Sequence, residues 1–157
     1  MQTLPKRMAK YSLRIHPEKS KLMKFVPGEK KPPTMDFLGF THYWTKSRKG
    51  NNIIKRRTSK KGIHKAIRKI QDSCKYNRHE RLKEQYELLS SKRRGLYQYY
   101  GIRGNFISIR TIYQEAIHIW LYWLNRRSQH NSYTWAGYQE LLKHFILPKP
   151  KIVHWNV

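Results

Sequence analysis

Acidic side chains that could bind catalytic metal ions are scarce and scattered in this sequence. Asp36 and Asp72 are the two aspartates, and they fall in different predicted elements. Two-metal phosphoryl transfer needs clustered carboxylates that hold two cations about 3.5–4 Å apart. Glu80, Glu84 and Glu87 follow one helix face at i, i+4 and i+7, a spacing typical of ion pairs with lysine. The sequence therefore predicts no catalytic carboxylate pair, and no enzyme activity for this chain alone.

Other catalytic and metal-binding patterns are missing from the sequence as well. Cys74 is the single cysteine, so neither a disulfide framework nor a cysteine-based zinc site can form within one chain. The eight histidines are dispersed, and none stands four residues from another. The sequence contains neither the phosphate-loop pattern GxxxxGK[ST] nor the nucleophile-elbow pattern GxSxG. We predict no metal, no cofactor and no small-molecule substrate for this chain, and a reducing compartment.

The net charge indicates the kind of partner. Among 157 residues, 34 are Lys or Arg and 9 are Asp or Glu, which gives a formal net charge of +25. Such self-repulsion favours association with a polyanion, and nucleic acid gains further from the release of condensed counterions. A membrane is the alternative, but no apolar run approaches the roughly 20 residues of a membrane-spanning helix. The N-terminal segment MQTLPKRMAKYSLRIHP also has no hydrophobic signal core.

Residues 93–105, RRGLYQYYGIRGN, combine tyrosines with arginines and glycines. On a helix, Tyr97 and Tyr100 share a face, so we expect both to fill a core with their hydroxyl groups hydrogen-bonded. Tyr99 must point elsewhere. Together with Arg94 it is expected to contact RNA, by stacking or by binding phosphate.

The N-terminal third of the chain is predicted to be β-structured. The alternation of Tyr11, Leu13 and Ile15 predicts a short strand within residues 7–16. The aromatic segment MDFLGFTHYW, the turn-forming TKSRKGNN and the segment IIKRRT together predict a β-hairpin.

After Thr58 the apolar period becomes helical. The first predicted helix is capped by Ser59 and has an apolar stripe at positions 63, 67, 70 and 74. A second helix is expected from about residue 80 to Tyr100, a third over about 107–127, and a short fourth that Thr134 caps. The predicted fold class is α+β, with a small hairpin-containing part followed by a mainly helical bundle.

Basic residues follow a second stripe of the first helix. Lys61, Lys65 and Arg68 lie along it, and the neighbouring segments KSRKG and KRR add charge without a compensating acid. A solvated helix face is the alternative, but this continuity favours a surface that faces phosphates. The predicted RNA-binding residues are Lys55, Arg56, Arg57, Lys60, Lys61, Lys65, Arg68, Arg94, Tyr99, Arg126 and Arg127.

Several stretches, in this order, resemble one protein family. They are LRIHPEKSKLMKF (13–25), DFLGFTHYW (36–44), RRGLYQYYG (93–101), WLNRRSQ (123–129) and LPKPKIVH (147–154). Together they resemble the C-terminal third of bacterial group II intron-encoded reverse transcriptase/maturases. The resemblance covers nearly the whole chain, and the order and spacing of the motifs make it specific.

The resemblance implies roles for individual residues. The segment HPEKS matches a late motif of the polymerase palm, and its Lys19 matches the lysine near the incoming nucleotide. Phe37, Leu38, Gly39 and Phe40 match the primer-grip hairpin, which holds the end of the growing strand. The implied domains are a palm remnant over residues 1–57, a thumb or maturase-specific domain over 58–147 and an extended tail over 148–157. The implied partners are structured intron RNA and an RNA–DNA duplex, in the cytoplasm of a bacterial-type cell.

The family's catalytic carboxylates, including its YADD pair, precede the first matching motif and have no counterpart in this sequence. Mg²⁺ is accordingly expected only for a complete reverse transcriptase or for the intron ribozyme. Three interpretations follow: an RNA-binding maturase domain that assists splicing, a subunit completed by a separately encoded palm and fingers fragment, or a remnant without function. For a remnant, residues 1–45 are expected to be protease-sensitive and residues 59–146 resistant, because strands cut from their sheet expose unpaired edges.

Overall fold

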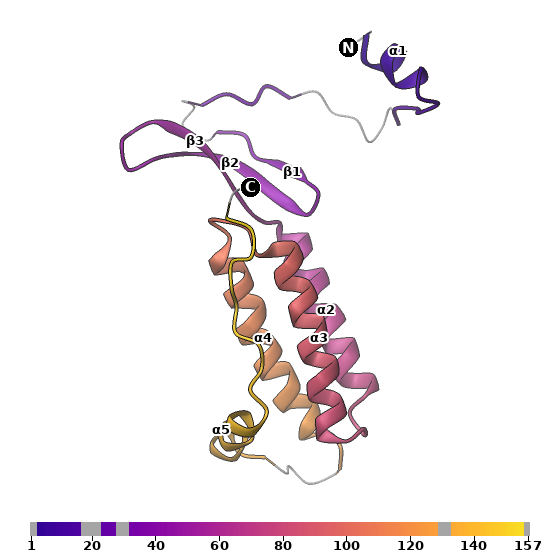
Figure 1. Cartoon of the computed structure of the whole chain (residues 1–157), viewed down its shortest axis with the longest axis vertical. Coiled ribbons are helices and arrows are strands. Elements are labelled where there is room, and N and C mark those ends of the chain that lie inside the picture. The colour runs from indigo at the N-terminus through magenta and orange to yellow at the C-terminus, as the bar shows by residue number, and fades with distance from the viewer. Residues whose placement is uncertain (1–2, 17–22, 28–31, 129–132, 156–157) are drawn as a thin grey trace. The chain divides into compact units, whose positions relative to one another are not determined.

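The chain divides into a small N-terminal unit and a larger one that contains a sheet and a helical bundle. The computed structural model describes residues 3–16, 23–27, 32–128 and 133–155. Contacts group the chain into the compact units Met1–Pro33 and Thr34–Val157. Among the described residues there are five helices and one three-stranded antiparallel sheet, which confirms the predicted α+β class (Figure 1).

The N-terminal unit begins with helix α1 (Thr3–Ala9), none of whose residues is buried. The chain then turns, with the backbone N–H groups of Tyr11 and Ser12 donating to the carbonyls of Met8 and Ala9. The strand predicted within residues 7–16 is therefore wrong. A strand needs a partner for its backbone groups, and no described residue pairs with this segment, whereas a helix satisfies them locally.

The larger unit begins with the sheet, whose strands follow the order β1-β2-β3. Strands β2 (Phe40–Lys46) and β3 (Asn52–Thr58) form the predicted hairpin, paired from Phe40↔Thr58 to Lys46↔Asn52. The additional strand β1 (Met35–Phe37) pairs with the start of β2. Leu38 (φ 47°) and Gly39 (φ 77°) join β1 to β2. Positive φ at both central residues is typical of a two-residue type I′ turn.

Four helices follow the sheet: α2 (Lys60–Tyr76), α3 (Leu82–Tyr100), α4 (Phe106–Leu124) and α5 (Trp135–His144). Both predicted caps are confirmed. Ser59 Oγ accepts a hydrogen bond from the Gly62 amide at 3.1 Å, and Thr134 Oγ1 accepts one from the Gly137 amide at 3.2 Å. These caps satisfy amides that have no partner within their own helix.

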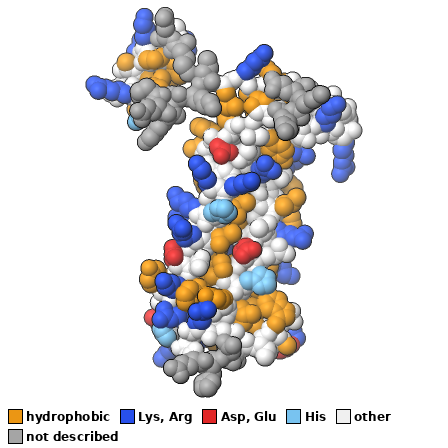
Figure 2. Space-filling view, turned by 180° about the vertical axis from the view of Figure 1, so that it is seen from behind, with side chains coloured by type: hydrophobic (Ala, Val, Ile, Leu, Met, Phe, Trp, Pro, Cys, Tyr) orange, Lys and Arg blue, Asp and Glu red, His pale blue; other side chains and the backbone are white. Residues whose placement is uncertain are grey.

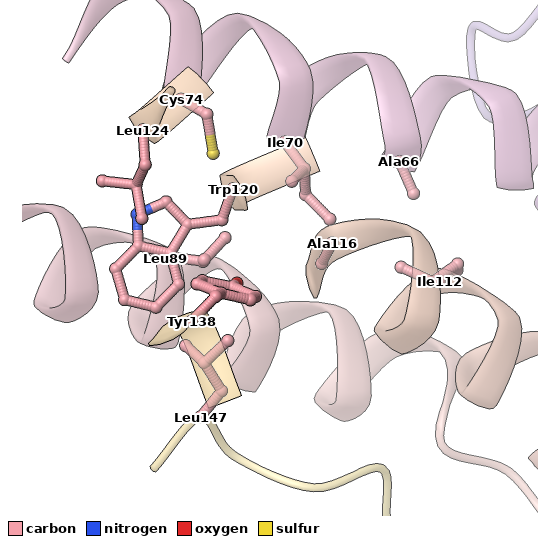
Figure 3. Packing of buried hydrophobic residues seen from close by; sticks show 10 residues of the cluster. All are labelled: Ala66, Ile70, Cys74, Leu89, Ile112, Ala116, Trp120, Leu124, Tyr138 and Leu147. Carbon is pink, nitrogen blue, oxygen red and sulfur yellow. The ribbon is translucent and has the colours of Figure 1, made fainter. Parts of the chain in front are cut away.

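The main core lies between these helices, with Trp120 in its middle (Figure 3). Trp120 is fully buried, and its indole N–H donates to Gln85 Oε1 at 3.0 Å. On α2, Ile70 and Cys74 of the predicted apolar stripe are buried, but Ile63 and Ile67 are only half-buried. Their predicted role in the core is taken in part by small residues, since Gly62 and Ala66 lie at the buried side of α2.

One side chain links the sheet to the bundle. Asn105 Oδ1 accepts a hydrogen bond from the Thr58 amide, and Asn105 Nδ2 donates to Thr58 Oγ1 and to the Tyr100 carbonyl, all at 2.8 Å. Asn105 is 1% exposed. The sheet thus packs in the same compact unit as the helices, although the family resemblance implies a domain boundary at residue 57. That boundary rests on the resemblance alone and stays a prediction.

The chain beyond α5 runs back along the bundle without regular helix or strand (Figure 1). The amides of Val153 and His154 donate to the Gly101 carbonyl at 2.7 and 3.0 Å. Ile152 and Val153 pack against a second small core of Tyr97, Tyr100 and Ile109. The tail therefore covers the part of the bundle nearest the sheet.

Candidate nucleic-acid interface

A groove of about 660 Å³ lies between the β1–β2 turn, the first turns of α2 and the end of α3. Its lining combines apolar and aromatic side chains with three lysines. The lining residues are Asp36, Phe37, Leu38, Gly39, Ser59, Lys61, Gly62, Lys65, Ala66, Lys69, Leu96, Tyr99 and Tyr100. We call it the first groove. It brings the primer-grip-like segment together with the basic face of α2.

The turn at the rim of the first groove is held from two helices. The Ser59 amide donates to the Gly39 carbonyl at 2.9 Å, and the Tyr99 hydroxyl donates to the Leu38 carbonyl at 2.7 Å. Gly62 permits this approach, because a Cβ atom there would lie 3.1 Å from the Gly39 carbonyl oxygen.

The turn presents apolar side chains to solvent. Phe37 is 57% exposed and Leu38 is 68% exposed. Leu38 also occupies the left-handed region, which costs a residue other than glycine roughly 1–2 kcal/mol. Strained backbone with exposed apolar side chains is common at ligand-binding sites.

Three exposed lysines follow the floor of the first groove. Lys61, Lys65 and Lys69 are spaced by four residues, so successive Cα atoms are separated by about 6 Å along α2. This spacing is comparable to that of neighbouring phosphates on one nucleic-acid strand. Sequence analysis missed Lys69, although its fourfold spacing from Lys65 is visible in the sequence.

A second groove, of about 520 Å³, continues along α2. It is lined by Lys61, His64, Lys65, Ile67, Arg68 and Gln71. Lys61 and Lys65 line both grooves, so the two adjoin. The structure thus brings together four predicted RNA-binding residues, namely Lys61, Lys65, Arg68 and Tyr99. Lys60, in the first turn of α2, is exposed but lines neither groove.

Basic residues greatly outnumber acidic ones on the surface formed by α2 and the hairpin, where Asp36 and Asp72 stand at its two ends in the sequence. Between residues 37 and 71 the sequence has 11 Lys and Arg residues and no Asp or Glu. Within the described part of the chain there is one ion pair, between Lys143 and Glu140 at 2.7 Å, on exposed α5 side chains. The positive charge of α2 and the hairpin therefore remains available to an external anion.

The hairpin separates the three predicted basic residues of β3. Lys55 pairs with Tyr43 and Arg57 with Thr41, whereas Arg56 pairs with His42 on the opposite face. The Arg57 guanidinium lies 5.3 Å from the centre of the Tyr43 ring. Lys55 and Arg57 thus share one face of the sheet, and Arg56 belongs to the other.

The tyrosine–arginine segment of α3 divides between core and surface. Tyr97 is buried and donates to the Pro148 carbonyl at 3.1 Å, so its predicted core role is confirmed. Tyr100 is buried as predicted, against Phe40. Tyr99 is 51% exposed at the first groove, but its hydroxyl is already bonded to the turn, which leaves the exposed part of its ring for stacking. Arg94 is exposed and lines neither groove.

Arg93, which sequence analysis did not single out, is the buried arginine of this segment. It is 1% exposed and donates to the Tyr97 hydroxyl oxygen at 2.8 Å and to the Pro148 carbonyl at 2.6 Å. Its guanidinium lies 4.1 Å from the centre of the Tyr113 ring. Burial lowers the pKa of Arg93 and raises the pKa of Tyr97 to about 12. Arg93 therefore fastens the tail to the bundle. Its position four residues before Tyr97 was the available signal.

The remaining predicted residues lie elsewhere. Arg126 and Arg127 follow the end of α4, a helix about 28 Å long that starts beside the sheet. The structure therefore does not place them with Lys60 and Lys61. Arg127 donates to the Glu80 carbonyl at 3.1 Å. Lys19 lies outside the described residues.

Comparison of the chain with protein-family models, with curated proteins and with solved structures finds no match. Function must be argued from the site. None of the described helices is long and apolar enough to cross a membrane. In the described ranges, no three His, Cys, Asp or Glu side chains are grouped as a metal site would require.

Proposed function

We propose that this protein binds RNA through the first and second grooves, as an RNA-binding domain of the group II intron maturase type. The observation that carries the proposal is a surface of α2 lysines that form no ion pair with any described residue, beside an exposed aromatic and apolar turn. Lysines on that surface would neutralise phosphates. The rings of Phe37 and Tyr99 offer faces on which unpaired bases stack. The intron RNA, rather than the protein, would carry out the splicing chemistry.

Salt dependence tests the electrostatic part of the proposal. If 6–10 phosphates are contacted, affinity should fall by roughly 10³–10⁵ between 50 and 200 mM salt. The measurement is the dissociation constant of the full chain for a labelled structured RNA across that range. Affinity that barely changes with salt would contradict binding through phosphates.

Specificity tests the intron part of the proposal. The full chain should bind a group II intron RNA more tightly than an unrelated structured RNA of equal length and charge. It should also lower the Mg²⁺ concentration at which that intron splices in vitro. Equal affinity for both RNAs, with no effect on splicing, would contradict the maturase function. The protein would then be a general RNA-binding protein.

A second candidate function is that of a subunit that completes a reverse transcriptase. It is favoured by the exposed Phe37–Leu38 turn, which matches the primer grip of the family and points apolar side chains outward. Mixed with a separately encoded palm and fingers fragment, the chain should support primer extension in the presence of Mg²⁺. A mixture that binds the template–primer but extends nothing would exclude this function while preserving RNA binding.

A further inference from the structure

A third groove, of about 360 Å³, opens between α2 and α4. It is lined by Ile67, Gln71, Glu115, His118, Ile119, Tyr122 and Trp123. Ile67 and Gln71 also line the second groove, which in turn shares Lys61 and Lys65 with the first. The three grooves therefore adjoin one another along and around α2, and we call them together the track, which starts at the β1–β2 turn and ends near the C-terminus of α4.

The chemistry of the track changes along its length. Lysines line its first two parts, joined by Arg68 in the second, whereas the lining of the third contains aromatic side chains and the Glu115 carboxylate but no Lys or Arg. In the view of Figure 2, Lys and Arg side chains spread along the bundle, and exposed hydrophobic side chains gather towards the end away from the sheet. A ligand that follows the whole track must therefore be anionic at one end and must offer a flat, uncharged surface at the other.

Tyr122 is the aromatic residue of the third groove that is best placed to stack. It is 48% exposed, and the guanidinium of Arg126 lies 4.2 Å from the centre of its ring. Tyrosine rings and arginine guanidinium planes are both surfaces on which unpaired RNA bases stack. The pair therefore forms a flat cationic platform at the edge of the third groove, where Tyr122 belongs to the lining and Arg126 lies over its ring.

Glu115 decides which part of a nucleotide can enter. Its carboxylate repels phosphate, so the sugar–phosphate backbone must stay over the lysines of the second groove. The same carboxylate can accept a hydrogen bond from a base amino group, as acidic side chains do from cytosine.

From Lys61 to Gln71 the track covers about 15 Å of α2, or roughly four nucleotides at a rise of 3.4 Å.

We infer that the third groove holds an unpaired, amino-bearing base of the bound RNA, stacked on the Tyr122–Arg126 pair. This inference rests on the proposed function, since the lysines of the first two grooves must hold the same strand. A fully paired duplex keeps its bases stacked inside the helix, so it cannot fill the third groove. The track therefore selects RNA with a single-stranded segment beside its phosphate contacts.

The test compares an unstructured 12-nucleotide RNA that contains cytosine with a blunt duplex that contains the same strand. We expect Tyr122→Leu to weaken binding of the unpaired RNA by about 10-fold, within the range of one base–aromatic stack, and to leave duplex binding unchanged. Tyr122→Phe should bind both RNAs like the wild-type protein, because stacking needs the ring and not the hydroxyl group. Tyr76→Leu is the matched control. Tyr76 is 76% exposed beside Lys75 and lines none of the three grooves.

Two failures can be told apart. If Tyr122→Leu binds the unpaired RNA like the wild-type protein while Lys65→Gln/Lys69→Gln weakens both RNAs, the base site is overturned. In that case the third groove does not bind a base, and a protein partner becomes the alternative occupant. The proposed function is unaffected. If neither RNA binds, or if lysine substitution changes nothing, the proposed function fails and the base site fails with it. Circular dichroism should show that each variant is folded.

Discussion

At the residue scale, the surroundings of Gly101 exclude any larger side chain, a constraint that its residue type alone does not reveal. A Cβ atom at this position would lie 2.2 Å from the Tyr97 carbonyl oxygen and 2.9 Å from that of Lys151. Gly101→Ala should therefore lower the free energy of unfolding by about 1–3 kcal/mol, the usual cost of overpacking. Denaturant unfolding measures this effect.

Gly95 supplies the control. It lies inside α3, and nothing stands within 4 Å of a Cβ atom there. Gly95→Ala should raise the free energy of unfolding by about 0.5–1 kcal/mol, because alanine loses less backbone entropy in a helix. Equal effects of the two substitutions would show that a Cβ atom at position 101 does not clash with the carbonyls of Tyr97 and Lys151.

A substitution at Leu38 should change stability and RNA affinity in opposite directions. Asparagine tolerates positive φ better than leucine does and is favoured at this position of a type I′ turn. Leu38→Asn should therefore raise the free energy of unfolding by about 0.5–1 kcal/mol. The same change removes an exposed apolar side chain from the rim of the first groove, so RNA affinity should fall. A variant that is both more stable and unchanged in affinity would exclude the turn from the interface.

Residue roles could be predicted from the sequence where spacing encodes them. The caps Ser59 and Thr134 and the buried side of α3 follow from patterns of one or two helical turns. The burial of Arg93 could not be predicted, because it depends on Tyr113 and on the Pro148 carbonyl, which approaches from 55 residues away. The neighbouring Arg94 has the same side chain but stays exposed, since helix rotation turns it outward.

At the scale of elements, α2 carries the lysines whose contribution to RNA binding can be tested directly. Replacing Lys65 and Lys69 by glutamine should reduce the salt dependence of RNA binding. The slope of log affinity against log salt should fall by about 0.7–0.9 for each phosphate that is no longer neutralised. Lys149→Gln/Lys151→Gln changes the net charge equally, on exposed tail residues that line none of the three grooves. Equal slopes for the two variants would mean that net charge, rather than the α2 surface, drives binding.

The elements themselves were largely predictable. Strong apolar periodicity predicts the β2–β3 hairpin and the helices α2, α3, α4 and α5. Long-range packing was not needed to predict that these elements exist. The predicted strand at 7–16 failed because the alternation of Tyr11, Leu13 and Ile15 is short and no described strand pairs with it; these residues follow α1 in a turn and a segment without regular structure. Strand β1 was hidden because three residues carry no readable period, and its register depends on the turn at Leu38 and Gly39.

At the scale of the molecule, residues 34–157 should fold without the N-terminal unit. None of the α1 side chains is buried, whereas Thr58 and Phe40 of the sheet pack against the bundle. A fragment of residues 34–157 should keep the unfolding free energy of the full chain to within about 1 kcal/mol. A fragment of residues 59–157 should lose several kcal/mol, because the buried Asn105 side chain would lose both of its hydrogen bonds to Thr58. Equal stability of the two fragments would contradict one cooperative unit.

Alkaline pH should destabilise the whole molecule. Burial raises the pKa of the Cys74 thiol from 9.0 to about 12, and that of Tyr97 from 10.0 to about 12. Above pH 9 the unfolded chain therefore releases protons that the folded chain retains, so stability is complete below pH 9 and falls towards pH 12. The loss reaches at most about 1.4 kcal/mol per pH unit for each group. Urea unfolding at pH 8 and 10 measures it, and Cys74→Ala should show a smaller decline.

Cys74 lies in the core with Ile70 and Trp120, as a neutral thiol in a residue that is 7% exposed (Figure 3). A maleimide dye or spin label should therefore ignore it in the folded protein at neutral pH. A cysteine introduced on the β2–β3 hairpin or on the outer side of α4 would then be the one reactive position of the chain. Distances between such probes and a labelled oligonucleotide could then show where the RNA lies on the protein, without first replacing Cys74.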